Sequence, residues 1–262
     1  MDKASWGGVV LGLGGIVGGL LLEGGRLSQV LQPTAAMIVF GGTAGAVLIQ
    51  FPLPVVLKAV RRLVHVFLPP TRGAAVMVQE LVRFANRARR EGIISLDTEL
   101  EKIDDPFLKK SLTLAVDGTE PQELRTIMEL DLENQWEHEE KIPQVFESAG
   151  GFSPTIGIIG AVLGLIQVMQ HLDKIDEVGR GIAVAFVATI YGVGAANLFL
   201  LPCAGKLRIR IREEQVVREM TLEGVVSILE GMNPRMVETK LLGFLAEGKP
   251  PQEKAAAAEV SK

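Results

Sequence analysis

Residues 148–172 read SAGGFSPTIGIIGAVLGLIQVMQHL, a run of 25 residues without Asp, Glu, Lys or Arg. Three further stretches, 4–22, 27–57 and 181–205, also lack all four charged residue types. A helix needs roughly 20 mostly apolar residues to cross the hydrocarbon core of a bilayer, whereas the surface of a soluble domain breaks up apolar runs every few residues. The sequence therefore predicts an all-α, four-span membrane protein. The expected spans lie near 5–22, 34–51, 152–171 and 181–201.

The basic residues beside the spans predict on which side of the membrane each loop lies, because Lys and Arg favour the cytoplasmic side. The short linkers 23–33 and 173–180 hold Arg26, Lys174 and Arg180. The opposite ends of the spans hold more basic residues: Lys58, Arg61, Arg62, Lys206, Arg208, Arg210 and Arg212. We therefore expect both termini and the loop 52–150 to be cytoplasmic, and the two short linkers to face outward.

The alternation of apolar and charged stretches divides the chain into five expected segments. They are a transmembrane hairpin (1–51), a charged helical cytoplasmic domain (52–150), a second transmembrane hairpin (151–202), C-terminal cytoplasmic helices (203–247) and a tail (248–262). The tail is composed mainly of Pro, Lys, Glu and Ala, which predicts disorder.

The charged segments contain helical patterns with clear ends. One helix is expected over 74–90, ending at Gly92, and another from about 121 toward the third span, with a perturbation at Pro143. A third is expected over 204–230. The pair Asn233-Pro234 should end it, and a last helix should run to about 246.

Pairs of glycines four residues apart mark the spans, for example Gly8 and Gly12, and Gly160 and Gly164. Small residues at this spacing let helix backbones approach closely in lipid. The pattern fits packing within one chain as well as packing between the subunits of a ring, and the two are not exclusive.

The residues of common catalytic and binding sites are missing or wrongly spaced. The histidines at 65, 138 and 171 have no metal-ligand spacing, and the chain has one cysteine, Cys203. No phosphate-binding glycine loop and no serine elbow is present. We therefore expect no enzyme, no metal site and no cofactor. The loop 58–145 carries 13 basic and 16 acidic residues, which argues against nucleic acid as a partner.

A second absence bears on ion transport, because ion-translocating proteins usually keep an ionisable group inside the membrane. None of the four expected spans contains Asp, Glu, Lys or Arg. Their interior polar residues are Thr155, Gln167, Thr189, Tyr191 and Asn197. If the chain moves ions, the titrating group should come from a partner that inserts a helix against the third and fourth spans.

The expected helix 74–90 carries a basic face, and an acidic run follows it. The basic residues are Arg83, Arg87, Arg89 and Arg90, and the acidic ones are Asp97, Glu99, Glu101, Asp104 and Asp105. This surface could dock another protein, or it could be a solvated face with weak ion pairs.

Several motifs of the chain resemble the MotA/PomA family, the stator subunits of the bacterial flagellar motor. The segment RREGIISLD (89–97) is similar to the family's cytoplasmic-loop motif, and SPTIGIIGAVLGLI (153–166) to its third span. AFVATIYG (185–192), followed by Asn197 to Pro202, resembles the fourth span. GMNPR (231–235) and KLLGFL (240–245) resemble the C-terminal signature. The similarity extends from the first span to about residue 246.

The resemblance implies an assembly and a function. Five such chains form a ring around two MotB-type chains in the bacterial inner membrane, and each MotB-type chain supplies the membrane aspartate that binds the ion. Ion passage drives rotation of the ring, and the cytoplasmic loops push against the rotor's switch protein FliG.

The resemblance also implies roles for individual residues. Arg89 and Asp97 match the charged positions that contact the rotor, with Arg90 beside the first and Glu99 as an alternative to the second. Pro154 and Pro202 match hinge prolines of spans three and four; the simpler interpretation is a first-turn proline and a helix stop. Thr189 matches a threonine near the ion path, although its hydroxyl could simply bond its own helix. Thr155 and Tyr191 are further polar residues on the expected path.

The position of Ala161 bears on the transported ion. Sodium-driven members of the family resemble one another in favouring threonine there, where a hydroxyl could replace part of the sodium hydration shell. Alanine offers sodium no such ligand, so we expect proton coupling.

Two rival interpretations stay open at this point. One is a proton-channel subunit of the ExbB/TolQ class that energises outer-membrane processes, but those chains resemble three-span proteins without an N-terminal hairpin. The other is a passive membrane scaffold or a self-sufficient transporter. A transporter should show inverted repeats and interrupted or charged spans, which this sequence lacks.

Overall fold

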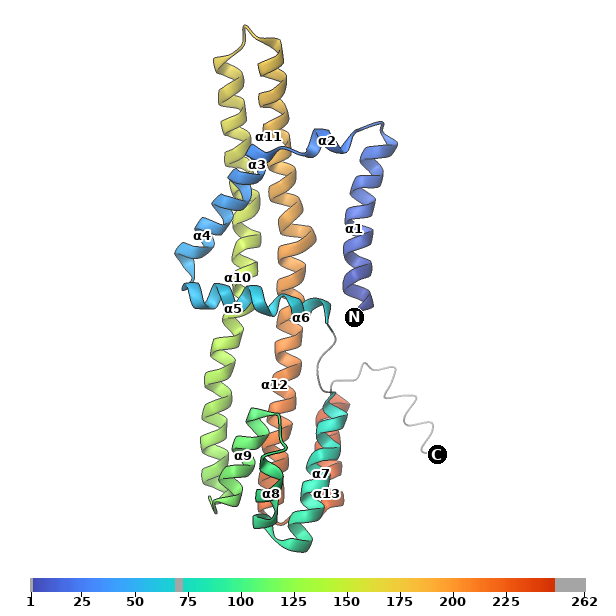
Figure 1. The fold of residues 1–262 in the computed structure, drawn as a ribbon, viewed down its shortest axis with the longest axis vertical. Helices are drawn as coiled ribbons and strands as arrows, with labels where there is room; N and C mark the ends of the chain where they lie inside the picture. Colours follow the sequence, from blue (N-terminus) through green and yellow to red (C-terminus); the bar gives the residue numbers. More distant parts are fainter. Residues whose placement is uncertain (1, 69–72, 248–262) are drawn as a thin grey trace. The chain divides into compact units, whose positions relative to one another are not determined.

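The computed structural model describes residues 2–68 and 73–247 (Figure 1). The tail 248–262, which we expect to be disordered, lies outside the described residues. Within the two described ranges all regular structure is helical, as the sequence predicts. The elements are α1 (Lys3–Leu22), α2 (Leu27–Val30), α3 (Pro33–Ala36), η1 (Met37–Gly41), α4 (Gly42–Gln50), α5 (Leu53–Arg62), α6 (Val64–Phe67), α7 (Ala74–Glu91), η2 (Ile93–Leu96), α8 (Asp97–Leu100), α9 (Pro106–Val116), α10 (Pro121–Gln170), α11 (Ile175–Ala195), η3 (Ala196–Leu200), α12 (Leu201–Leu229) and α13 (Pro234–Glu247).

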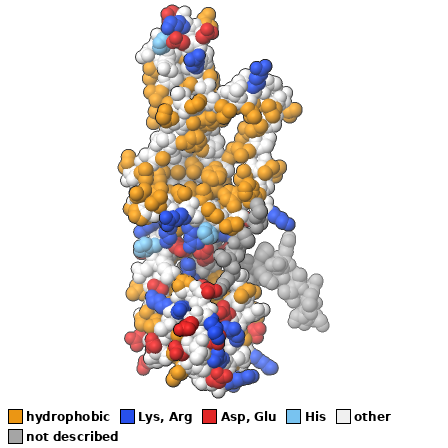
Figure 2. All heavy atoms as spheres, in the orientation of Figure 1, with side chains coloured by type: hydrophobic (Ala, Val, Ile, Leu, Met, Phe, Trp, Pro, Cys, Tyr) orange, Lys and Arg blue, Asp and Glu red, His pale blue; other side chains and the backbone are white. Residues whose placement is uncertain are grey.

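Four helical stretches of the described chain are long and apolar enough to cross a membrane, which confirms the predicted four-span class. The first is α1, and the second is formed by α3, η1 and α4 in succession. The third lies within α10, and the fourth within the continuous helix that runs from α11 through η3 into α12. Hydrophobic side chains cover the visible face of these helices (Figure 2).

The chain divides into two compact units. The first, which we call the span unit, comprises Met1–Pro69 and His138–Arg210, and so includes α5 and α6 as well as the spans. The second, which we call the charged unit, comprises Pro70–Glu137 and Ile211–Lys262. The helices α10 and α12 have residues in both.

In the span unit, α10 and α11 approach each other at backbone distance through glycines. A Cβ atom on Gly192 would lie 2.6 Å from the Ser153 carbonyl oxygen, and one on Gly164 would lie 2.8 Å from the Gly181 carbonyl oxygen. Distances of this size leave no room for a side chain. For α10 and α11, the glycine pattern therefore serves packing within one chain. Most glycines of α1, Gly8 among them, have nothing within 4 Å of such a Cβ.

The start of α1 is held by a cluster of polar contacts around Asp2. Its carboxylate accepts from the Ala4 amide at 3.1 Å, which caps the helix, and pairs with Lys206 and Arg210 of α12. The hydrogen bond from Lys206 is the main cause that lowers the pKa of Asp2 to about 2. The Asp2 amide donates to the Phe67 carbonyl oxygen at 3.0 Å, so the end of α6 joins the same cluster.

The charged unit has a hydrophobic core of its own, to which α7, α9, α12, α13 and the first turns of α10 contribute. Its largest fully buried side chains include Leu81, Phe84, Leu112, Leu124 and Leu241. The α7 helix packs along α13.

The helix ends in the charged unit follow the sequence predictions. Gly92 has φ 86° and ends α7, because a residue with a Cβ rarely adopts that conformation. The side chain of Asn233 accepts from the Arg235 amide at 3.1 Å at the start of α13. In the span unit, α10 continues through Pro143, where we expected a perturbation.

A largely buried carboxylate links three helices of the charged unit through ion pairs. Glu223 of α12 accepts a hydrogen bond from Arg125 of α10 at 2.9 Å and pairs with Lys240 of α13. Burial raises the pKa of Glu223, but the hydrogen bonds from Lys240 and Arg125 outweigh that effect, so its pKa lies below the ordinary value of 4.5.

We expect Glu223→Gln to lower the stability of the full chain by roughly 1–3 kcal/mol at pH 7, because two cations lose their charged partner. Since the folded-state pKa is lowered, this stabilisation is complete above pH 4.5 and is lost as the pH falls through the folded-state value. Thermal unfolding of the purified chain at pH 7 and at lower pH measures both effects. Glu219→Gln, an exposed carboxylate on the same helix, is the control. Equal melting temperatures for the two variants at pH 7 would contradict the expectation.

Candidate functional site

Thr155, an expected ion-path residue of the third span, lies next to the expected hinge Pro154 in α10. Pro154 is inside the helix and has no amide to donate to the Gly150 carbonyl. The next residue, Thr155, donates its hydroxyl to the Phe152 carbonyl oxygen at 2.8 Å. The hydroxyl of Ser153 is fully buried and has no hydrogen-bond partner in the described chain. Pro154 thus removes one bond from the backbone ladder of α10, and the Ser153 hydroxyl beside it is buried without a partner among the described residues.

Ala161 lies two turns further along α10, where it is half-buried. Its neighbour Gly160 faces α11, since a Cβ there would lie 2.8 Å from the Cβ of Ala188. Ala161 is therefore the next residue after a point where α10 contacts α11.

The two expected ion-path residues of α11 are both engaged in hydrogen bonds. Thr189 donates its hydroxyl to the Ala185 carbonyl oxygen of its own helix at 3.2 Å, the simpler of the two roles that the sequence allows. Tyr191 donates to the Val30 carbonyl oxygen at 2.6 Å and accepts from the Gln32 amide at 3.2 Å. Its ring also stacks on Phe40 at 5.9 Å. Tyr191 thus fastens α11 to the linker before the second span.

Pro202, the second expected hinge, lies two residues after the end of a π-helical turn. This turn, η3, ends where the Leu201 amide donates to the Ala196 carbonyl oxygen, five residues back. A proline cannot continue the regular ladder, and π turns occur frequently at functional sites. The neighbouring Leu201 packs on Gly150 of α10, where a Cβ would lie 2.6 Å from its side chain. The resemblance predicted a hinge at this proline, but the sequence carried no signal for the π turn.

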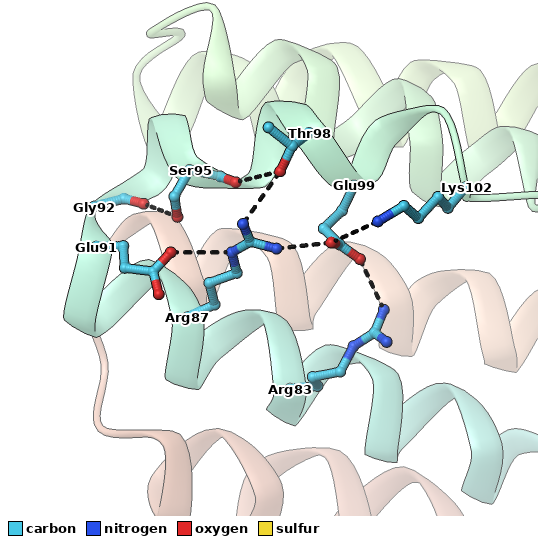
Figure 3. Close-up of polar contacts among 8 residues, drawn as sticks. All are labelled: Arg83, Arg87, Glu91, Gly92, Ser95, Thr98, Glu99 and Lys102. Carbon is cyan, nitrogen blue, oxygen red and sulfur yellow. Dashed lines mark hydrogen bonds and ion pairs between the residues drawn. The ribbon is translucent and has the colours of Figure 1, made fainter.

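In the charged unit, Glu99 is held by several cations (Figure 3). Arg87 donates to Glu99 at 2.7 Å and to Thr98 at 3.2 Å, and Lys102 and Arg83 pair with the same carboxylate at 3.3 and 3.5 Å. The hydrogen bond from Lys102 is the main cause that lowers the pKa of Glu99, with Arg87 adding to it.

Arg87 makes the shortest contact of this cluster; the sequence placed it on the basic face of the helix but not among the expected docking residues. It also donates to Glu91 at 3.2 Å, one helical turn further along α7. The four-residue spacing of Arg87 and Glu91 was the available signal.

The other expected docking residues are presented to solvent. Arg89 and Arg90 lie in the last turn of α7, and Asp97 begins α8; all three side chains are exposed. Within residues 2–68 and 73–247 they take part in no ion pair. The turn from Gly92 to Leu96 joins them on one end of the unit. Of the four expected docking residues, Glu99 is the one that forms ion pairs with other described residues.

The described residues contain no group of three or more His, Cys, Asp or Glu side chains that could hold a metal ion. Cys203 is buried.

Comparison with known proteins identifies relatives of the whole chain. Residues 6–92 match the family model described as Motility protein A N-terminal, and residues 99–220 match that of the MotA/TolQ/ExbB proton channel family. Motility protein A of Bacillus subtilis is 37% identical over 94% of this chain and 91% of its own length. The structure of C. jejuni MotAB superposes with a TM-score of 0.88 at 31% identity, covering 95% of this chain and 98% of the matched one. The flagellar MotAB stator complex from Bacillus subtilis gives 0.85 at 35% identity, covering 98% and 100%.

Proposed function

This chain belongs to the motility protein A group of the MotA/TolQ/ExbB proton channel family, and on that premise we propose that it is a stator subunit of the bacterial flagellar motor. With a MotB-type partner it forms a proton-conducting channel that couples ion flow to torque on the rotor. The solved relatives are MotAB complexes, which supports the partner. Five copies surround two partner chains in the bacterial inner membrane, with both termini in the cytoplasm.

The absence of charged residues from the spans is the observation that supports a partner chain as the source of the titratable group. The stretches 4–22, 27–57, 148–172 and 181–205 contain no Asp, Glu, Lys or Arg. Proteins that move protons usually keep a titratable group inside the hydrocarbon region. In our proposal the partner chain supplies it, as an aspartate placed against α10 and α11.

The ion path of the proposal follows Thr155, Ala161, Thr189 and Tyr191. The hydroxyls of Thr155 and Thr189 each bond a carbonyl of their own helix, and a hydroxyl in such a bond still has lone pairs for water. The hydroxyl of Tyr191 is held in position by its hydrogen bonds with the backbone of Val30 and Gln32. Alanine at 161 provides no side-chain oxygen for a sodium ion, which supports proton coupling.

We expect swimming of the source cell to continue at its normal speed when sodium is replaced by potassium at fixed pH, and to stop when a protonophore is added. The reason is that water can pass a proton along where sodium needs several oxygen ligands. Cell tracking in matched buffers measures both. Loss of swimming on sodium removal alone would contradict proton coupling, while leaving the stator function itself intact.

Pro154 and Pro202 are the proposed hinges of spans three and four. Each interrupts the regular hydrogen-bond ladder of a long helix, and the contact of Gly150 with Leu201 lies beside both. Bending at this level would move α10 and α12 together.

The proposed rotor-contacting surface consists of Arg89, Arg90, Asp97 and Glu99, and its partner is the switch protein FliG. The exposure of the first three supports direct contact. The three cations around Glu99 support a structural contribution from that residue.

We expect Arg89→Glu and Asp97→Lys each to reduce swarming partially, by about twofold to fivefold, with no change in melting temperature. Several charges share the contact, so no single exposed pair dominates it. Glu99→Lys should instead lower the melting temperature, because it places a fourth cation among Arg83, Arg87 and Lys102. Swarm diameters and thermal unfolding of the same variants provide the test. Full swarming of an Arg89→Glu/Asp97→Lys double variant would mean that this surface is only solvated.

A further inference from the structure

The helices α5 and α6 form a strap along one end of the spans. The strap begins three residues after the second span ends at Gln50. Arg62 at the end of α5 donates to Glu139 of α10 at 2.9 Å. The carbonyl oxygen of Phe67 accepts from the Asp2 amide at the start of the first span. The strap therefore begins at the end of the second span, contacts the charged part of α10, and ends beside the start of the first span.

The outer side of the strap carries an apolar stripe. Leu53, Leu57, Val60 and Val64 are spaced by four, three and four residues, and each is at least 50% exposed. This is the spacing of one helical face. Ala59 and Val66, on a different face, are buried against the rest of the span unit. An exposed apolar stripe beside the spans fits hydrocarbon better than water.

A second stripe, of basic residues, runs beside the first. Lys58, Arg61 and His65 each follow a residue of the apolar stripe by one position, about a quarter turn around the helix. All three are exposed, and among the described residues they form no ion pair. Figure 2 shows basic side chains gathered at the level of α5 and α6, next to the hydrophobic surface of the spans.

We propose that the strap binds the anionic headgroups of the adjacent membrane leaflet, with the apolar stripe in the acyl chains and Lys58 and Arg61 on the phosphates. A helix with one apolar and one basic face lies in the plane of a bilayer interface. Basic residues at that depth attract anionic lipids. The strap thus enriches phosphatidylglycerol-type lipids around the ends of the spans.

The chain carries a reporter for this lipid. Its two tryptophans are Trp6 and Trp136. Trp6 is 45% exposed, and its ring lies 5.4 Å from that of Phe67 in the strap. In a Trp136→Phe background, the fluorescence of Trp6 in vesicles of brominated phosphatidylglycerol, compared with brominated phosphatidylcholine, measures the local preference for the anionic lipid.

We expect the full chain to prefer phosphatidylglycerol at Trp6, and the preference to fall by on the order of fivefold for each charge removed in Lys58→Gln and Arg61→Gln. It should also fall when the salt concentration is raised from 0.1 to 1 M. Salt screens exposed charges, and the Debye length is only about 3 Å at 1 M. Lys174→Gln/Arg180→Gln, which removes one basic residue between α10 and α11 and one in the second turn of α11, should leave it unchanged.

An unchanged preference in the Lys58→Gln/Arg61→Gln variant would overturn the proposal, as would an equal loss in the Lys174→Gln/Arg180→Gln control. Both pairs of substitutions are at exposed positions, and equal melting temperatures would show that the variants are folded. The measurement needs neither ion flow nor a rotor, so it stands or falls separately from the stator function.

Discussion

Gly192→Ala is expected to abolish swarming and to lower the stability of the chain, although it adds a single methyl group. A Cβ at this position would lie 2.6 Å from the Ser153 carbonyl oxygen and 3.1 Å from the Gly157 Cα. Both neighbours are backbone atoms, so neither can rotate aside. The clash forces α10 and α11 apart next to Pro154, at a cost of about 1–3 kcal/mol.

The matched control for this variant is Gly194→Ala, two residues further along the same helix, where a Cβ meets nothing within 4 Å. It should keep its melting temperature or raise it slightly, since alanine favours helix over glycine. Swarm diameter, immunoblotting of membranes and thermal unfolding of purified chains separate lost assembly from lost expression. Normal swarming of Gly192→Ala would show that the close approach is dispensable.

Pro154→Ala should produce the opposite combination, a more stable chain that fails to drive motility. Alanine restores the amide N–H, from which the Gly150 carbonyl can accept a hydrogen bond. A proline inside a helix costs about 3 kcal/mol of stability. If Pro154 is a hinge, straightening α10 there should reduce swarming at least about tenfold. The melting temperature of the purified chain should rise.

Pro143→Ala provides a control with the same chemistry in the same helix, eleven residues earlier. This substitution should also raise the melting temperature, but it should leave swarming near normal because the proposed hinges are Pro154 and Pro202. Normal swarming of Pro154→Ala would refute the hinge, and equal losses in both variants would show that any stiffening of α10 is harmful.

Much of this fold was predictable because single residues dominate its boundaries. A span requires about 20 residues without charge, and the charge-free stretches meet that requirement. Gly92 ends α7 because of its backbone conformation, and Asn233 with Pro234 separates α12 from α13. Each of these effects acts over a few neighbouring residues, so the sequence alone carries it.

The functional geometry was less predictable because it depends on contacts between distant residues. Glu99 and Asp97 are nearly equivalent in sequence, yet one is surrounded by Arg83, Arg87 and Lys102 and the other is exposed. Whether glycines packed within or between chains depended on the register of α10 against α11. The bond from Tyr191 to Val30 spans 161 positions, and nothing local indicates it.

Tyr191 is the chain's one tyrosine, and this gives the link it makes an experimental use. Fluorotyrosine supplied to cells during expression would label this chain at a single site without any substitution. Because the hydroxyl contacts both Val30 and Gln32, opening of that link would change the fluorine's chemical shift. One NMR resonance would then report whether α11 and the linker before the second span stay joined during each cycle of ion passage.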